Sequence, residues 1–205
     1  IIINGASGLS LGGSVSSAGD INKDGYDDII IGATNADTPQ TNSGRTYVIF
    51  GNNTLNNIDL ANFGSTQGFY INGAKANDQS GYSVSSAGDI NHDGYDDVII
   101  GALYADPLYK LDAGISYVIF GNSSLNNINL LSLSILDGFS MYGESGYGKS
   151  GTSVSSAGDI NGDGYDDVII GAPYENSSAG VTYVLFGGAN GIINTELYNL
   201  ESSKG

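Results

Sequence analysis

The sequence carries one pattern three times, at a spacing of about 70 residues. The segment SVSSAG precedes an acidic nonapeptide each time: DINKDGYDD at 20–28, DINHDGYDD at 89–97 and DINGDGYDD at 159–167. Each nonapeptide runs into an apolar stretch ending in GA, and YVIFG or YVLFG follows further on. Internal repeats are typical of folds in which each unit packs on the next, so one supersecondary unit must account for the whole chain.

Each unit predicts four short β-strands. The segments SVSSAG, IIIGA or VIIGA, TYVIFG and FYING are rich in β-branched and aromatic residues and are bounded by Gly, Asn, Asp or Ser. No helical period of about ten residues or more is present, and residues 53–63 are expected to form a loop with one turn. Four antiparallel strands per unit predict an all-β fold of β-propeller blades. The repeats are placed at 1–68, 69–138 and 139–205.

The ends of the chain fall at a repeat boundary. Ile1 aligns with Phe69 and Phe139, so the chain starts at the fourth strand of a blade. Three blades are fewer than the usual four to eight, and closure of a ring within one chain is not expected. Two interpretations stay open: the chain is a piece of a longer array, or residues 1–5 complete blade three of a second copy in a head-to-tail assembly.

Charge and composition exclude several classes of partner. Acidic residues outnumber basic ones by 22 to 6, for a net charge of −16, which argues against binding to nucleic acid or to anionic membrane surfaces. No apolar stretch approaches the roughly 20 residues of a membrane helix, so no membrane insertion is expected. The absence of Cys excludes disulfides and thiolate metal sites.

The nonapeptide has the donors of a cation site. Its positions 1, 3, 5 and 9 are Asp, Asn, Asp and Asp in every copy, and position 6 is Gly. Hard oxygen donors at alternate positions of a sharply turned loop suit calcium, and the residue at position 7 would offer its backbone carbonyl. This predicts one calcium ion per repeat. The candidate ligands are Asp20, Asn22, Asp24, Tyr26 and Asp28; Asp89, Asn91, Asp93, Tyr95 and Asp97; and Asp159, Asn161, Asp163, Tyr165 and Asp167.

Two other structures could carry such a nonapeptide. An EF-hand needs an acid at position 12 followed by a helix, but position 12 is Ile31, Ile100 or Ile170 inside a predicted strand. An Asp-Gly hairpin with a solvated turn does not explain why the same donors recur while position 4 changes. The acids at position 8 are expected to lie outside the ligand set, either behind it or facing outward. These are Asp27, Asp96 and Asp166.

Further motifs give the units a family resemblance. Each unit ends its third strand in Phe-Gly, and the run after the acidic loop ends in Gly-Ala, which is extended to GAP at 171–173. With the acidic loop between them, the units resemble the FG-GAP repeat of integrin α-subunit β-propellers and their bacterial relatives. Thr34 and Leu103 depart from the Pro of that pattern. The resemblance implies one blade per unit, calcium in the loop between the first two strands, with the same ligands, and an extracellular adhesion or ligand-binding module.

The strand order places the variable loops on the face opposite the acidic loops. These loops are 34–44, 74–81, 103–114, 144–151 and 173–180, and they hold Tyr104, Tyr109, Tyr147, Tyr174 and Glu175. Aromatic residues on the loops of a rigid scaffold suit binding to a protein or a glycan, while ordinary loop packing explains any one of these tyrosines equally well. The sequence therefore predicts a structural role for calcium and a ligand-binding surface on the other face.

Two alternatives remain beside a secreted or cell-surface binding module. The chain could be a structural repeat of a surface filament or matrix, assembled by strand exchange through residues 1–5. It could also be an accessory domain of an enzyme that degrades polysaccharides or lipids. Activity within these residues is not expected, since there is a single histidine, His92, and no Ser-His-acid or Cys-His set.

Overall fold

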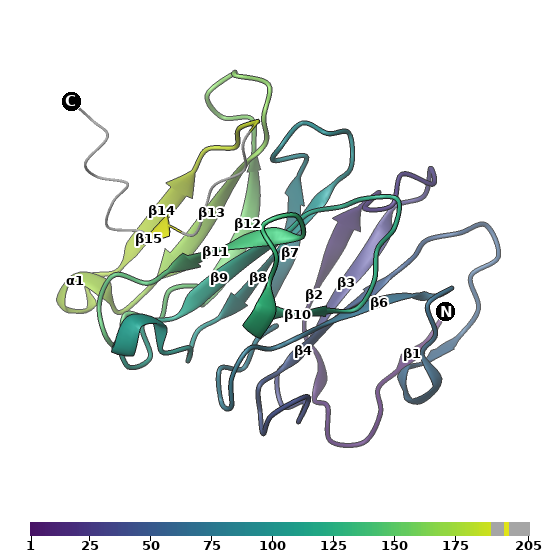
Figure 1. The fold of residues 1–205 in the computed structure, drawn as a ribbon, viewed down its shortest axis with the longest axis horizontal. Coiled ribbons are helices and arrows are strands. Elements are labelled where there is room, and N and C mark those ends of the chain that lie inside the picture. Colours follow the sequence, from purple (N-terminus) through teal and green to yellow (C-terminus); the bar gives the residue numbers. More distant parts are fainter. Residues whose placement is uncertain (190–194, 197–205) are drawn as a thin grey trace.

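The computed structural model describes residues 1–189 and 195–196 and has an all-β fold (Figure 1). Three antiparallel sheets follow one another along the chain. The first contains β2 (Leu11–Gly19), β3 (Asp28–Ala33), β4 (Arg45–Ile49) and β6 (Gly68–Asn72) in that order. Each four-stranded unit is a blade, which confirms the predicted propeller-blade fold class. The repeat boundaries at 68/69 and 138/139 remain a prediction.

The second sheet reproduces the first, and the described strands of the third reproduce its first three strands. In the second sheet the order is β7 (Ser83–Gly88), β8 (Asp97–Ala102), β9 (Ile115–Ile119) and β11 (Gly138–Tyr142). In the third sheet the described strands are β12 (Ser153–Gly158), β13 (Asp167–Ala172) and β14 (Val181–Leu185). The first strands β2, β7 and β12 lie next to one another, and the Val84 backbone N–H of β7 donates to Ser14 Oγ of β2 at 3.0 Å.

Short parallel strands cover the outer edges. Here β10 (Ile128–Asn129) pairs with β6, and β15 (Thr195–Glu196) pairs with β11. At the N-terminus, β1 (Ile3–Asn4) pairs with β5 (Ile58–Asp59), a strand from the long connection between β4 and β6. The N-terminal segment therefore lies beside the first sheet, at the end of the molecule away from β14 (Figure 1).

The core consists of the layers between sheets. Successive side chains of a strand point to opposite faces, so Val98 and Ile100 of β8 pack toward the first sheet, while Ile99 packs toward the third. All six residues of β8 are buried. The glycine of the Gly-Ala motif is needed for this packing, because a Cβ on Gly32 would collide with the carbonyl oxygen of Gly81.

In the part of the chain that the structure describes, helical structure is confined to short turns. The turn expected within residues 53–63 is present as a 3-10 helix, η1 (Leu60–Asn62), and the second repeat has the corresponding η3 (Leu130–Ser132). Two turns were not expected: η2 (Pro107–Tyr109) and α1 (Glu175–Ser178). Within the described ranges, none of these segments has the length and apolar character to span a bilayer.

Candidate metal centre

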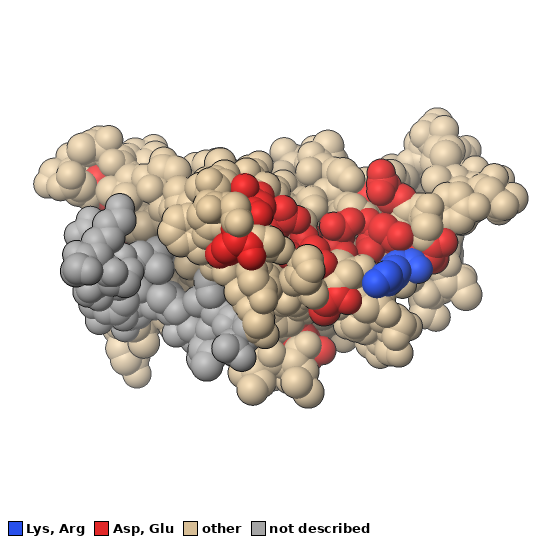
Figure 2. All heavy atoms as spheres, turned by 90° about the horizontal axis from the view of Figure 1, so that it is seen from above, with Lys and Arg blue, Asp and Glu red and all other residues tan. Residues whose placement is uncertain are grey.

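The three acidic segments form loops at one end of the sheets, where each connects the first strand of a sheet to the second. We call them loop one (residues 20–28), loop two (89–97) and loop three (159–167), and their end of the molecule the acidic face. Figure 2 looks onto this face and shows Asp and Glu side chains gathered in a band across it. Lys23 is the one Lys or Arg in the three loops, so the band is almost entirely negative.

Each loop folds around the carboxylate of its first residue. In loop one, Asp20 Oδ1 accepts from the Asp24 N–H and Asp20 Oδ2 from the Gly25 N–H, both at 2.9 Å. The Asn22 side-chain oxygen accepts from the Asp24 N–H at 2.9 Å, and Asp24 Oδ1 accepts from the Tyr26 N–H at 3.0 Å. The loop is thus held in one conformation by its own candidate ligands.

Loops two and three repeat this arrangement. Asp89 accepts from the N–H groups of Asp93 and Gly94 at 2.9 and 2.8 Å. In loop three, Asp159 accepts from Gly164 at 2.9 Å and also from Gly162 at 2.7 Å. Led by the Gly164 N–H, these donors hold the pKa of the exposed Asp159 carboxyl below its usual range.

The Asp at position 9 has a different environment from the others. Asp28 is buried, and its two oxygens accept from the backbone N–H groups of Ile21 at 3.0 Å and Gly51 at 2.7 Å. Asp97 is bonded in the same way to Ile90 and Gly121, at 3.0 and 2.8 Å. This residue therefore ties the loop to the end of the third strand.

The third copy keeps the same bonds. Asp167 accepts from Ile160 and from Gly187, both at 2.9 Å. The donors Gly51, Gly121 and Gly187 are the glycines of the Phe-Gly motif. Sequence reasoning missed this role, although the recurrence of Phe-Gly in every unit was its signal.

Burial and crowding of negative charge act together on these acids. Burial raises the pKa of Asp28 to about 6; the Gly51 and Ile21 N–H groups oppose this rise, and the charges of Asp24 and Asp20 add to it. Asp97 is more deeply placed, and burial raises its pKa to about 8. The charged groups that act most on both are the carboxylates of their own loops. Such clusters favour a bound cation as the counter-charge.

The donor chemistry of the loops fits calcium. The side chains at positions 1, 3, 5 and 9 of each loop offer carboxylate or amide oxygens as metal ligands. Oxygen is the ligand type that a hard cation such as calcium prefers. Among the described residues, no three His, Cys, Asp or Glu side chains converge closely enough to form a metal site by themselves. The structure places the fifteen predicted ligands in three loops, five in each. Their coordination of a cation remains a prediction.

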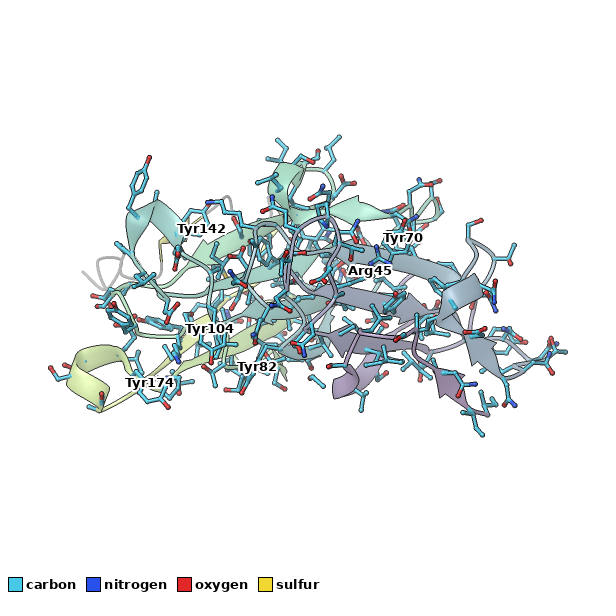
Figure 3. The ribbon with its side chains drawn as sticks, turned by 90° about the horizontal axis from the view of Figure 1, so that it is seen from below. Arg45, Tyr70, Tyr82, Tyr104, Tyr142 and Tyr174 are labelled. Carbon is cyan, nitrogen blue, oxygen red and sulfur yellow. The ribbon has the colours of Figure 1, made fainter. Side chains whose placement is uncertain are left out.

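The face at the other end of the sheets carries the variable loops; we call it the opposite face. Figure 3 views it from below, with Tyr82, Tyr104 and Tyr174 in the same region. The ammonium group of Lys149 lies 4.5 Å from the ring centroid of Tyr104 and 5.5 Å from that of Tyr174. Tyr109 is fully exposed. These tyrosines come from loops of two neighbouring sheets, so folding assembles them.

Glu175 does not contribute to this exposed surface. It was expected there with the tyrosines, but it is 2% exposed and its Oε1 accepts from the Ser145 backbone N–H at 2.8 Å. Sequence reasoning also missed Arg45, which stacks on Tyr70 at 4.1 Å and donates to Asn72 at 2.8 Å. Neither residue recurs at its repeat position, where Ala105 stands for Glu175 and Ile115 and Val181 stand for Arg45, so no repeated signal could have revealed them.

Comparison with known families is decisive for the architecture. Residues 12–49, 80–119 and 150–185, more than half of the chain, match the family described as FG-GAP repeat. The chain belongs to the FG-GAP repeat family. Each matched stretch runs from the first strand of a sheet through the acidic loop to the third strand.

Similar proteins include integrin α subunits and one enzyme. Integrin alpha-PS2 of Drosophila melanogaster is 30% identical over 69% of this chain and 10% of its own length. Human integrin alpha-6 is 29% identical over 75% of the chain and 12% of its own length. Phosphatidylinositol-glycan-specific phospholipase D of Bos taurus is 30% identical over 80% of the chain and 19% of its own length. The chain spans at most about a fifth of these relatives.

Proposed function

We propose that this chain is a ligand-binding β-propeller module of a cell-surface or secreted adhesion protein, in which calcium stabilises the blades. The observation that carries the proposal is the division of the FG-GAP units into two faces. The acidic face repeats one oxygen-rich loop three times, whereas the loops of the opposite face differ from unit to unit and carry tyrosines in the second and third units. Integrin α subunits among the similar proteins support adhesion as the setting.

The residues of each loop define the part that calcium would play. Bound calcium would supply the positive charge that offsets the carboxylates. The first, third, fifth and ninth side chains, with the seventh carbonyl, would hold the ion, and the ninth Asp also ties the loop to the Phe-Gly glycine. Extracellular calcium sites have dissociation constants of roughly 10⁻⁴–10⁻³ M. At millimolar calcium, three sites with a constant of about 0.1 mM would add about 4 kcal/mol to the unfolding free energy.

Calorimetry tests the calcium part of the proposal. We expect isothermal titration to give three calcium ions per chain, and the melting temperature to fall when EDTA replaces calcium. Asp24→Ala, Asp93→Ala and Asp163→Ala should each remove one ion from the stoichiometry. Asp59→Ala, in the connection between β4 and β6, is the control and should leave three. A melting temperature unmoved by EDTA would disprove the role of calcium.

Binding arrays test the ligand-binding part. Immobilised extracellular-matrix proteins and glycans should retain the calcium-loaded chain, and Tyr109→Ala with Tyr174→Ala should weaken this retention. Leu136→Ala is the control, because Leu136 is exposed and lies in the connection between η3 and β11, away from the tyrosine loops. Retention that depends on Leu136 and not on the tyrosines would place the ligand elsewhere. We expect no enzymatic activity, since the chain has a single histidine, no Cys and no Ser-His-acid set.

A structural repeat assembled through residues 1–5 is the second candidate. It is favoured by one observation: in the described part of the chain β14 is an edge strand of the third sheet, whereas β1 pairs only with β5. Light scattering decides between the two. Assembly predicts particles larger than the 21.1 kDa chain that dissociate when residues 1–5 are deleted, and a monomer in calcium would contradict it.

A further inference from the structure

Neighbouring acidic loops are joined by a hydrogen bond from the backbone of one loop to a carboxylate of the next. The Asp20 N–H in loop one donates to Asp96 Oδ2 in loop two at 2.7 Å, and the Asp89 N–H in loop two donates to Asp166 Oδ2 in loop three at 2.9 Å. Hydrogen bonds to ionised carboxylates are shorter and stronger than neutral ones. The Asp at position 8 of loops two and three therefore holds the backbone of the loop that precedes its own.

Ring contacts join the same pairs of loops. The Lys23 ammonium group of loop one lies 5.2 Å from the ring centroid of Tyr95 in loop two. The His92 ring of loop two meets the Tyr165 ring of loop three edge-on, with centroids 5.7 Å apart. Position 4 of loops one and two thus contacts position 7 of the next loop, so the side chain that varies most within these loops is also part of the junction.

The glycine before each loop fits this interlocking. Gly19 and Gly88 have φ values of +66° and +68°, and a Cβ on either would collide with the side chain of Asp96 or Asp166. Gly158, before loop three, has φ +64°, but no atom of the described residues lies within 4 Å of a Cβ placed there. Gly19 and Gly88 thus leave room for the carboxylate of the next loop. At Gly158, glycine is favoured only by the positive φ.

The position-8 acid of loop one and the first residue of loop three show the two halves of such a junction without a partner in the described residues. Asp27, at position 8 of loop one, is exposed, and among the described residues nothing donates to it. The Asp159 N–H of loop three likewise has no acceptor in the described ranges. Ile21 and Ile90, at position 2 of loops one and two, are 0% and 2% exposed, whereas Ile160 is 56% exposed.

We propose that Asp96 and Asp166 are positioning residues that set the cation affinity of the loop before their own. Each holds the backbone of a residue, Asp20 or Asp89, whose own side chain is the first candidate ligand. The coupling has a direction: loop two supports loop one, and loop three supports loop two. The readout of this proposal rests on the calcium binding proposed above, but the hydrogen bonds themselves do not.

Terbium titration can resolve the loops separately. Tb³⁺ is a hard cation that replaces Ca²⁺ at oxygen sites, and its emission is sensitised by a nearby Tyr. In a background with Tyr95→Phe and Tyr165→Phe, Tyr26 reports loop one, and the rings at the junctions are kept. We expect Asp96→Ala to raise the terbium midpoint of loop one about tenfold, the effect of losing one charge-assisted hydrogen bond.

The matched control is Asp27→Ala, which removes the same residue from the same loop position where no neighbour donates. It should shift the loop-one midpoint by less than about twofold. If Asp27→Ala weakens loop one as strongly as Asp96→Ala does, the eighth Asp is a ligand of its own loop and the proposal is wrong. An unchanged loop-one midpoint in Asp96→Ala also overturns it. The milder Asp96→Asn keeps an acceptor oxygen and should give an intermediate shift, which covers the case of a poorly folded alanine variant.

Amide exchange separates this proposal from the calcium proposal. If the unmodified chain binds neither Tb³⁺ nor Ca²⁺, the calcium function fails. The proposed affinity role falls with it, while the junction bond itself is still tested by NMR. The Asp20 amide should then exchange faster in Asp96→Ala than in Asp27→Ala. Equal exchange in the two variants would show that the bond does not hold loop one.

Discussion

On the opposite face, the two junctions between neighbouring sheets use different residues to provide a carboxylate acceptor for the equivalent backbone N–H. At the first junction, the Lys75 backbone N–H donates to Asp78 Oδ2 at 3.1 Å. At the second, the corresponding Ser145 N–H donates to Glu175 Oε1 at 2.8 Å, and Glu175 belongs to the next sheet. Both acceptors are buried. On the acidic face, by contrast, both junctions use an Asp at position 8.

Each junction on the opposite face has only one of the two acceptors, with a small residue at the repeat position of the other. Gly148 stands at the repeat position of Asp78, and a Cβ there would collide with the Glu175 carboxylate. Ala105 stands at the position of Glu175 and is fully buried. The acidic face is therefore tied to one loop geometry. The opposite face requires only that a carboxylate reach the N–H, which leaves its loops free to differ.

Exchanging the acceptors gives the largest effect. Gly148→Asp puts a second carboxylate into occupied space, and Glu175→Ala leaves the Ser145 N–H without an acceptor, so each should lower the unfolding free energy by about 3 kcal/mol. The double variant reproduces the first junction and should recover most of the loss. Urea unfolding in calcium measures all three.

Gly146→Asp is the control for this exchange. Gly146 is exposed two residues away, and a Cβ there would come no closer than 3.4 Å to its nearest neighbour. Its effect should stay within about 0.5 kcal/mol. If the double variant is as unstable as the two single changes added together, the two junctions are not equivalent.

The glycines before the loops test the acidic face with a smaller effect. Gly19→Ala must overcome both the left-handed backbone and the clash with Asp96, and should cost about 2–3 kcal/mol. Gly158→Ala meets only the backbone strain and should cost about 1 kcal/mol. Thermal unfolding of the two variants side by side measures the difference. Equal losses would mean that the first junction leaves room for the methyl group.

The acceptor at the first junction should make stability depend on pH. Burial raises the pKa of Asp78 to about 6; the N–H and charge of Lys75 oppose this rise, and the charge of Asp106 adds to it. The folded state thus binds this proton more tightly than the unfolded state. Its contribution is present at acid pH and is lost as pH rises from about 4 to about 6, with an effect on the order of 1 kcal/mol. Asp78→Asn should flatten this part of the pH profile; an unchanged slope would assign the dependence to other carboxyls.

The exposed contact at the second junction should matter least. Lys149 lies between the rings of Tyr104 and Tyr174, and partly exposed cation–π pairs contribute about 0.5 kcal/mol. Lys149→Ala should therefore change the unfolding free energy by about that amount in urea. Gln79→Ala, at the same position of the first junction, is the reference. A loss above about 2 kcal/mol would show that Lys149 supports the sheet packing.

Particular elements show how far sequence reasoning reaches. Strand positions such as Ile99 and Val98 follow from alternation, because a two-residue period assigns each side chain to one layer. The loop was also predicted, since its Gly and alternating oxygen donors are local. The placement of β1 beside β5 was not, because a two-residue parallel pairing leaves no pattern in either segment.

The sequence by itself determined the all-β blades and the composition of each acidic loop, because these depend on spacing within about ten residues, and it showed the repeat because the same motifs recur about every 70 residues. Only the tertiary structure decided what the acids do beyond their own loop. Asp28 reaches the Phe-Gly glycine, Asp96 reaches loop one, and Glu175 fills the space that Gly148 leaves. Those partners lie more than 20 residues apart in the chain, and they meet because packed sheets bring their loops together and every buried N–H needs an acceptor.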